Sequence, residues 1–239
     1  MLPRTTPLCC IAGSSLALVL AGLLCATPVR AQTPPTAAEY AAYTGLHAAA
    51  AQGRASEVED LVKAGGDLEA RDDNGRTPLL VAAYRRDAAV AKALLDAGAN
   101  PNVLDNQSYD AVTIAAVGND IAMLNLMLSS GGNARAITSP YSGTALIASA
   151  HAGHVGVVEL LIAHRAPLNH VNNLGWTALI EAIVLGDGSE RYQKIVAALI
   201  AAGADLNLAD RNGKTPLTLA REKGVTEIAA LLDKAGAKP

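Results

Sequence analysis

The chain has 239 residues, of which 51% are hydrophobic, yet only 3% are aromatic and none is phenylalanine. This composition excludes a fully disordered chain and favours closely packed helices rich in Ala, Leu, Val and Ile over a sandwich with an aromatic centre. The 19 basic and 22 acidic side chains nearly balance, for a net charge of −3. A nucleic-acid-binding surface normally carries a basic surplus, so we expect no nucleic acid partner.

The N-terminal segment 1–31 is typical of a cleavable export signal. Arg4 supplies the early positive charge, an apolar run spans residues 11–24, and a small-x-small cleavage sequence ends at Ala31. The apolar run is shorter than the roughly 20 residues that span a membrane. We predict cleavage after Ala31, and an uncleaved membrane anchor is the alternative.

All three cysteines lie in this N-terminal segment, at Cys9, Cys10 and Cys25. Lipoprotein processing at Cys25 is disfavoured because Leu24, just before it, is too bulky for that motif. A mature chain that starts at Gln32 therefore has no disulfide, no thiolate nucleophile and no cysteine-ligated metal. We expect it to be periplasmic or secreted, without contact to the membrane after cleavage.

The rest of the chain repeats a pattern about 33 residues long. Each unit opens with a helix-capping residue, and these residues are Thr44, Thr77, Asp110, Thr144, Thr177 and Thr215. Proline at the first helical position, as at Pro78, supports a helix start. Each unit then predicts two short helices and a turn-rich stretch suited to a hairpin. The predicted units are 44–76, 77–109, 110–143, 144–176, 177–214 and 215–239.

Residues 32–43 are predicted to form a linker and an N-terminal cap. Within them, the sequence Thr36-Ala37-Ala38-Glu39 fits a capping box and predicts a short lead-in helix.

These units resemble the ankyrin repeat. The family pattern has a Thr-Pro-Leu-His opening, an Ala-Ala pair, a Gly-His turn, a Leu-Leu pair and a Gly-Ala-Asp-x-Asn exit. Its counterparts here are residues 44–49, 153–154, 160–161 and 203–207. The resemblance covers about residues 44–237. It implies an all-α solenoid of about six helix–turn–helix units joined by β-hairpin loops, and a module that binds protein without being an enzyme.

A cluster of four histidines is the one candidate for a metal site: His151, His154, His164 and His170. His154 is predicted to begin a helix and His164 to end it, and ten residues of helix separate them by roughly 15 Å. No single ion reaches both. His151 and His154 alone lack the further ligands that zinc requires. With no triad context and no phosphate loop, we predict no metal, cofactor or catalytic residue.

Ankyrin proteins usually bind partners with their hairpin tips and the exposed face of their first helices. Three repeated columns are candidates for this groove: the residue before each opening position, the fourth residue after it and the seventh residue after it. The first contains Arg76, Tyr109 and Trp176, the second Val81, Ile114 and Glu181, and the third Tyr84, Val117 and His151. We predict that these residues contact a partner. The alternative is that several pack between neighbouring first helices.

The fifth unit carries five extra residues near 186–192, at the turn between its two helices. Loops tolerate insertions at low cost, so neutral drift is one interpretation. The other is a protruding contact loop with Arg191 and Tyr192 as its anchors.

Together these features predict an exported, bacterial periplasmic protein that scaffolds, protects or inhibits an unidentified protein partner. We expect it to be a monomer. A secreted effector or toxin-neutralising protein is the main alternative. An enzyme or metal carrier that uses the histidines of the fourth unit is the third hypothesis.

Overall fold

The computed structural model describes residues 32–239, and the predicted export signal and its cleavage site lie outside them. Residues 32–239 form one unit, built from a lead-in helix and six pairs of helices. The lead-in helix is α1 (Ala37–Ala42). The pairs are α2 (Gly45–Gln52) with α3 (Ala55–Lys63), α4 (Pro78–Arg85) with α5 (Ala88–Asp96), α6 (Ala111–Val117) with α7 (Ile121–Ser129), α8 (Ala145–Ala152) with α9 (Val155–Ala163), α10 (Ala178–Val184) with α11 (Glu190–Ala201), and α12 (Pro216–Lys223) with α13 (Thr226–Lys234).

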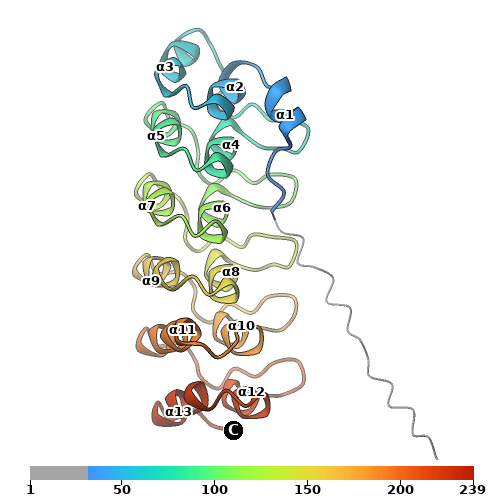
Figure 1. The fold of residues 1–239 in the computed structure, drawn as a ribbon, viewed down its shortest axis with the longest axis vertical. Helices are drawn as coiled ribbons and strands as arrows, with labels where there is room; N and C mark the ends of the chain where they lie inside the picture. Colours follow the sequence, from blue (N-terminus) through green and yellow to red (C-terminus); the bar gives the residue numbers. More distant parts are fainter. Residues whose placement is uncertain (1–31) are drawn as a thin grey trace, which may run out of the picture. The chain divides into compact units, whose positions relative to one another are not determined.

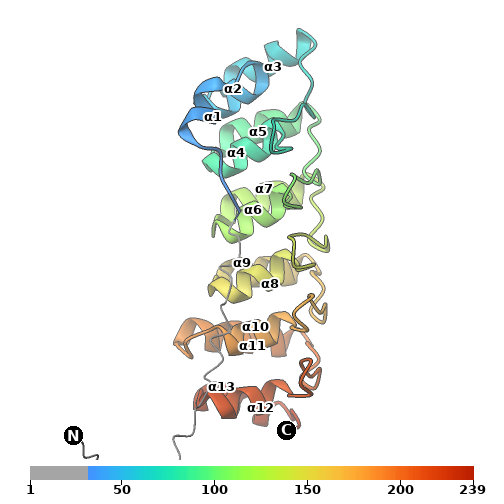
Figure 2. The same cartoon turned by 90° about the vertical axis from the view of Figure 1, so that its right-hand side faces the viewer.

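Each helix pair stacks on the next, so that residues 32–239 contain two parallel rows of helices (Figure 1). The first-helix row consists of α2, α4, α6, α8, α10 and α12, and the second-helix row of α3, α5, α7, α9, α11 and α13. Loops join successive pairs and extend beyond the first-helix row, as the two views show together (Figures 1 and 2). The all-α ankyrin solenoid predicted from the sequence is confirmed.

The predicted caps explain where five of the six first helices begin, whereas the prediction for Thr44 is wrong because its side chain makes no capping hydrogen bond. The side chains of Thr77, Asp110, Thr144, Thr177 and Thr215 each accept a hydrogen bond from the backbone N–H three residues further on. The predicted capping box is also present. Thr36 Oγ1 accepts from the N–H of Glu39 at 3.2 Å, and the Glu39 carboxylate accepts from the N–H of Thr36 at 2.6 Å.

The connecting loops fold back as narrow hairpins, and each hairpin bonds to the next. The N–H of Asp105 donates to the carbonyl of Tyr109 at 2.9 Å and closes one hairpin. Backbone bonds between neighbouring hairpins are Asn106 N–H to Asn74 O, Ser139 N–H to Ser108 O, and Asn173 N–H to Tyr141 O, at 2.8–2.9 Å. The only β pairing described between residues 32 and 239 is one antiparallel bridge, from Thr138 to Gly143.

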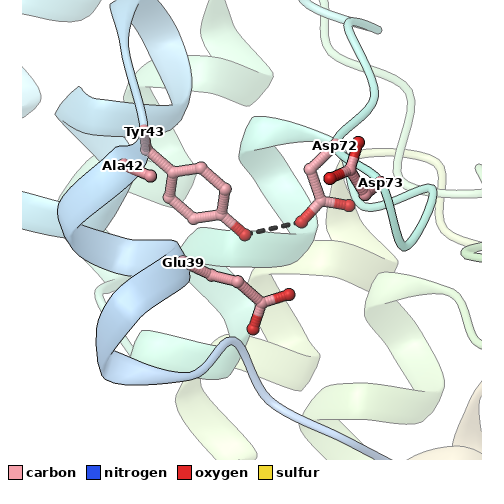
Figure 3. Close-up of a pocket in the computed structure, with 5 residues that line it drawn as sticks. All are labelled: Glu39, Ala42, Tyr43, Asp72 and Asp73. Carbon is pink, nitrogen blue, oxygen red and sulfur yellow. Dashed lines mark hydrogen bonds between the residues drawn. The ribbon is translucent and has the colours of Figure 1, made fainter.

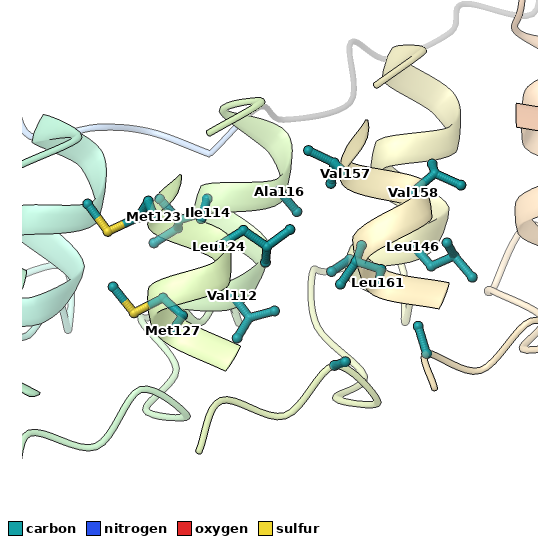
Figure 4. Close-up of a cluster of buried hydrophobic side chains, with 14 of the residues drawn as sticks. Val112, Ile114, Ala116, Met123, Leu124, Met127, Leu146, Val157, Val158 and Leu161 are labelled. Atoms are coloured by element: carbon teal, nitrogen blue, oxygen red, sulfur yellow. The ribbon is translucent and has the colours of Figure 1, made fainter. Parts of the chain in front are cut away.

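The core is a continuous layer of small and aliphatic side chains between the two rows. In the third and fourth units it includes Val112, Met123, Leu124, Val158 and Leu161, all buried (Figure 4). Each unit covers its apolar face only by contact with its neighbours, so the units depend on one another for stability.

Candidate partner-binding surface

In the column four residues after each opening position, the three predicted contacts are closed off inside the first-helix row. The exposed fraction is 0% for Val81, 3% for Ile114 and 4% for Glu181. The helices that carry them are α4, α6 and α10. Each is covered on two sides by its neighbours in the row and on a third by its own second helix, so these three residues pack between helices. The prediction that these three residues line a groove is wrong, and the packing alternative describes them.

In the column just before each opening position, some residues are buried and others are partly exposed. Arg76 and Tyr109 are buried, so the prediction that they contact a partner is also wrong. Both residues end a hairpin, and their backbone N–H groups donate to the aspartate at its start: Arg76 to Asp72 at 2.8 Å, and Tyr109 to Asp105 at 2.9 Å. Trp176 occupies the same slot but is only half-buried, which leaves part of its ring available.

The column seven residues after each opening position reaches the surface in every unit but the first, where Ala51 is buried. Tyr84, Val117, His151 and Val184 are all of intermediate exposure, and we call them the half-exposed row. Burial raises the pKa of the Tyr84 phenol well above its ordinary value of 10, so this side chain stays neutral. Three of the four were predicted contacts and remain candidates.

His151 does not stand alone in this row. Its Nδ1 lies 3.1 Å from Oε2 of the buried Glu181, and Asn172 Nδ2 donates to the other carboxylate oxygen at 2.9 Å. The hydrogen bond with Glu181 raises the pKa of His151 above its usual 6.5, and burial of the ring opposes this only in part. The pair therefore fixes the orientation of the imidazole at the surface.

The insertion in the fifth unit is folded against the solenoid. It lengthens the link between α10 and α11 and extends α11 to 12 residues, whereas α9 has nine. Arg191 is exposed and pairs with Asp187 at 3.1 Å. Tyr192 is only 5% exposed, and its hydroxyl donates to the backbone carbonyl of His151 at 2.9 Å. The prediction of Tyr192 as a partner anchor is wrong, because its ring holds the insertion to the preceding unit.

Sequence reasoning missed a set of exposed apolar side chains on the hairpins, which we call the hairpin strip: Leu104, Ile137, Val171 and Leu174. Their exposed fractions are 37%, 58%, 46% and 44%. The first three share a register, six residues after Gly98, Gly131 and Arg165, so a search of this column would have found them. Apart from His170, segments 136–143 and 166–176 carry no ionisable side chain except Tyr141.

A pocket of about 230 Å³ lies at the N-terminal end of the stack, lined by Glu39, Ala42, Tyr43, Asp72 and Asp73 (Figure 3). The Tyr43 hydroxyl donates to Asp72 at 2.6 Å. Burial pushes the pKa of Asp72 upward, but hydrogen bonds from Tyr43 and Arg76 outweigh it and hold the pKa below 3.8.

The buried Arg76 guanidinium balances this acidic pocket. It bonds Asp72 at 2.7 Å and also contacts the Glu39 carboxylate. Because Glu39 belongs to α1 and Asp72 to the first hairpin, Arg76 ties the lead-in helix to the first unit. The acidic side chains therefore form a structural joint.

The histidines of the fourth unit point to different partners, and no metal site is formed within residues 32–239. His154 Nδ1 donates to the carbonyl of Ala116 at 3.2 Å, and His170 Nε2 to that of Ser142 at 2.7 Å. The helices of this described part are also all too short or too polar to cross a membrane.

These observations define a class: a solenoid of stacked helix pairs whose hairpins and first helices present a surface for another protein. A family model described as ankyrin repeats (three copies) matches residues 8–105, 46–136 and 112–210. The chain belongs to the ankyrin repeat family, whose modules mediate protein–protein interaction.

Several known proteins are similar to this chain. An ankyrin repeat domain from Acinetobacter baumannii AYE is 44% identical, with a TM-score of 0.78, over 81% of this chain and 98% of that one. A chain in the complex of the predatory endopeptidase Bd0816 with the immunity protein Bd3460, from Bdellovibrio bacteriovorus, is 29% identical, with a TM-score of 0.68, over 80% and 98%. The ankyrin repeat protein YahD of Escherichia coli strain K12 is 48% identical over 98 residues, 41% of this chain and about half (49%) of YahD.

Proposed function

We propose that this protein is a non-enzymatic binding module, exported to the periplasm, that holds a partner protein on its hairpin and first-helix side to scaffold, protect or inhibit it. The observation that carries this proposal is the hairpin strip. Four large apolar side chains, each 37–58% exposed, lie on the hairpins, and the segments that carry Ile137, Val171 and Leu174 have only Tyr141 and His170 as ionisable side chains. Exposed apolar groups in such an arrangement are typical of protein interfaces.

The half-exposed row and Trp176 extend this surface toward the first helices. Tyr and Trp are frequent anchors at interfaces, because they bury a large area with little loss of conformational entropy. The exposed Arg191 adds a charged contact at the fifth unit.

Inhibition is the mode that the comparisons favour. One similar chain comes from a complex between an endopeptidase and an immunity protein. A toxin-neutralising protein that acts outside the periplasm is the second candidate function, since it would use the same surface on a foreign target.

Affinity capture from a periplasmic extract tests the surface. The bait is the purified protein, compared with a variant that carries Ile137→Glu and Leu174→Glu. The matched control is Ile121→Glu: Ile121 is 49% exposed but lies on α7, in the second-helix row. We expect a protein that is retained by the parent and the control and lost from the double variant. Equal retention by all three baits would contradict the proposed surface.

Export is tested separately by cell fractionation and N-terminal sequencing. We expect the mature protein in the periplasmic fraction with Gln32 as its first residue. An intact N-terminus in the cytoplasmic fraction would contradict export, and recovery in the medium would favour the toxin-neutralising function.

A further inference from the structure

Glu181 is a charged side chain in a column that is otherwise apolar. The corresponding residues of the other units are Ala48, Val81, Ile114, Ala148 and Leu219. Only 5% of the Glu181 side chain is exposed. An ionised carboxylate at such a position is strongly destabilising unless hydrogen bonds and an opposite charge compensate it.

The compensation comes from two other elements. His151 on α8 places Nδ1 3.1 Å from one carboxylate oxygen, and Asn172 on the fourth hairpin donates to the other at 2.9 Å. Of these two partners, only His151 can carry a positive charge. The charge balance of the junction between the fourth and fifth units therefore depends on whether His151 is protonated.

Most of the other ionisable groups on the elements around this junction have partners of their own, including Glu190 with Lys194 on α11 at 2.7 Å, whereas Glu159 on α9 and His164 at its end are exposed to solvent. On α11, Arg191 bonds Asp187, and the Tyr192 hydroxyl reaches the backbone of His151 and not its ring. At the start of α9, His154 bonds the carbonyl of Ala116. Lys214, just before α12, pairs with Glu222 at 2.5 Å. Lys223 on α12 donates to the carbonyls of Ile183 and Val184. Helix α6, on the far side of α8, has no ionisable side chain from Ala111 to Val117.

We propose that the His151–Glu181 pair makes the junction between the fourth and fifth units a pH-sensitive joint, which is tight when His151 is protonated and looser when it is neutral. Neutral His151 still donates one hydrogen bond from Nδ1, but the charge that balances the carboxylate is lost. Since His151 belongs to the half-exposed row, the same proton changes the charge of that row. The joint is internal to this chain and stands whether or not the proposed partner exists.

The direction of the effect follows from linkage. The pKa of His151 is raised above 6.5 in the folded protein by its hydrogen bond with Glu181. A group of this kind contributes stability that is fully present below its unfolded pKa and is lost as the pH rises through its folded pKa. The joint is therefore tightest below about pH 6.5 and loosens above it.

Hydrogen exchange measured by mass spectrometry tests the proposal on the purified protein. After correction for the intrinsic pH dependence of exchange, we expect amides of α10 to open about three-fold more often near pH 8 than near pH 5.5, the size expected for a partly exposed ion pair. Glu181→Gln and His151→Gln remove this difference. The matched control His154→Gln keeps it, because His154 bonds a backbone carbonyl and no carboxylate.

An NMR titration of the His151 ring in the parent protein is the second measurement, and it needs no variant to fold. We expect its midpoint above 6.5 and a lower midpoint in Glu181→Gln. A midpoint at or below 6.5 in the parent protein overturns the proposal. So does an exchange difference that persists in folded Glu181→Gln.

Discussion

Tyr192 offers the clearest test of what the insertion in the fifth unit does. Tyr192 is only 5% exposed, and an aromatic side chain buries about 150–250 Å². At about 25 cal/mol per Å² this corresponds to roughly 4–6 kcal/mol as an upper value, and truncation of a buried aromatic typically costs about 3–5 kcal/mol. We therefore expect Tyr192→Ala to lower the free energy of unfolding by about 3–5 kcal/mol. Tyr192→Phe, which loses only the hydroxyl bond to the His151 carbonyl, should lower it by about 0.5–1.5 kcal/mol.

The assay is urea unfolding followed by circular dichroism, with hydrogen exchange to locate the loss. Exchange should accelerate first in α8 and α11, which the ring joins. Arg191→Ala is the matched control. Its side chain is about half exposed, its pair with Asp187 is a surface ion pair, and its guanidinium lies 5.0 Å from the centre of the Tyr192 ring, so we expect a change of about 1 kcal/mol at most. If Tyr192→Ala were no more destabilising than this control, the ring would not anchor the fold, and the interpretation as a partner contact would return.

Three further substitutions test the Arg76 ion pair, the Asp110 cap and the packing of Gly186. Arg76→Met leaves Asp72, whose side chain is 10% exposed, without its guanidinium; we expect a loss of about 3–5 kcal/mol in thermal or urea unfolding, and a neutral effect would contradict the charge-balance role. Burial raises the pKa of Asp110 above 3.8, so its contribution to stability falls as the pH rises from 3.8 through the folded pKa. Asp110→Thr, which keeps the cap, should therefore raise the Tm by about 1–4 °C at pH 7 and by less near pH 4, and an equal gain at both pH values would refute this. A Cβ at Gly186 would lie 2.2 Å from the backbone carbonyl oxygen of Ala182 and 2.5 Å from the Tyr192 ring, so Gly186→Ala should cost about 1–3 kcal/mol in urea unfolding, whereas the exposed neighbour Leu185→Ala should change little.

The repeat architecture was predictable because its signals are local. A capping side chain and the N–H that it satisfies lie three residues apart, so Thr77 and Asp110 mark helix starts in the sequence itself. The period of about 33 residues then shows how often the unit recurs, and a unit that cannot cover its own apolar face must stack. The sequence thus contained the order and type of the helices.

Which columns are buried was harder to predict from the sequence, because burial depends on contacts between units. Arg76 and Glu181 carry charges and so resemble surface residues, yet both are buried with partners that the fold brings to them. His151 lies 30 residues from Glu181, and Glu39 lies 37 residues from Arg76. Tyr192 is buried because Gly153 and Gly186, from two different units, leave room for its ring. No local pattern reports such pairs.

Substitution of Ile114 and Ile137 tests the difference between buried and exposed positions. They are the same residue type in the same unit, but Ile114 is 3% exposed between α4 and α8, whereas Ile137 is 58% exposed on the hairpin. Ile114→Glu places a carboxylate in the closed core without a partner, and we expect it to lose at least about 4 kcal/mol of stability. Ile137→Glu exposes its carboxylate to water and should change stability by no more than about 0.5 kcal/mol. Urea unfolding of both variants decides the matter. Equal losses would mean that the hairpin strip is part of the core and unavailable to a partner, whereas the expected contrast leaves Ile137 as a residue whose substitution reports on binding alone.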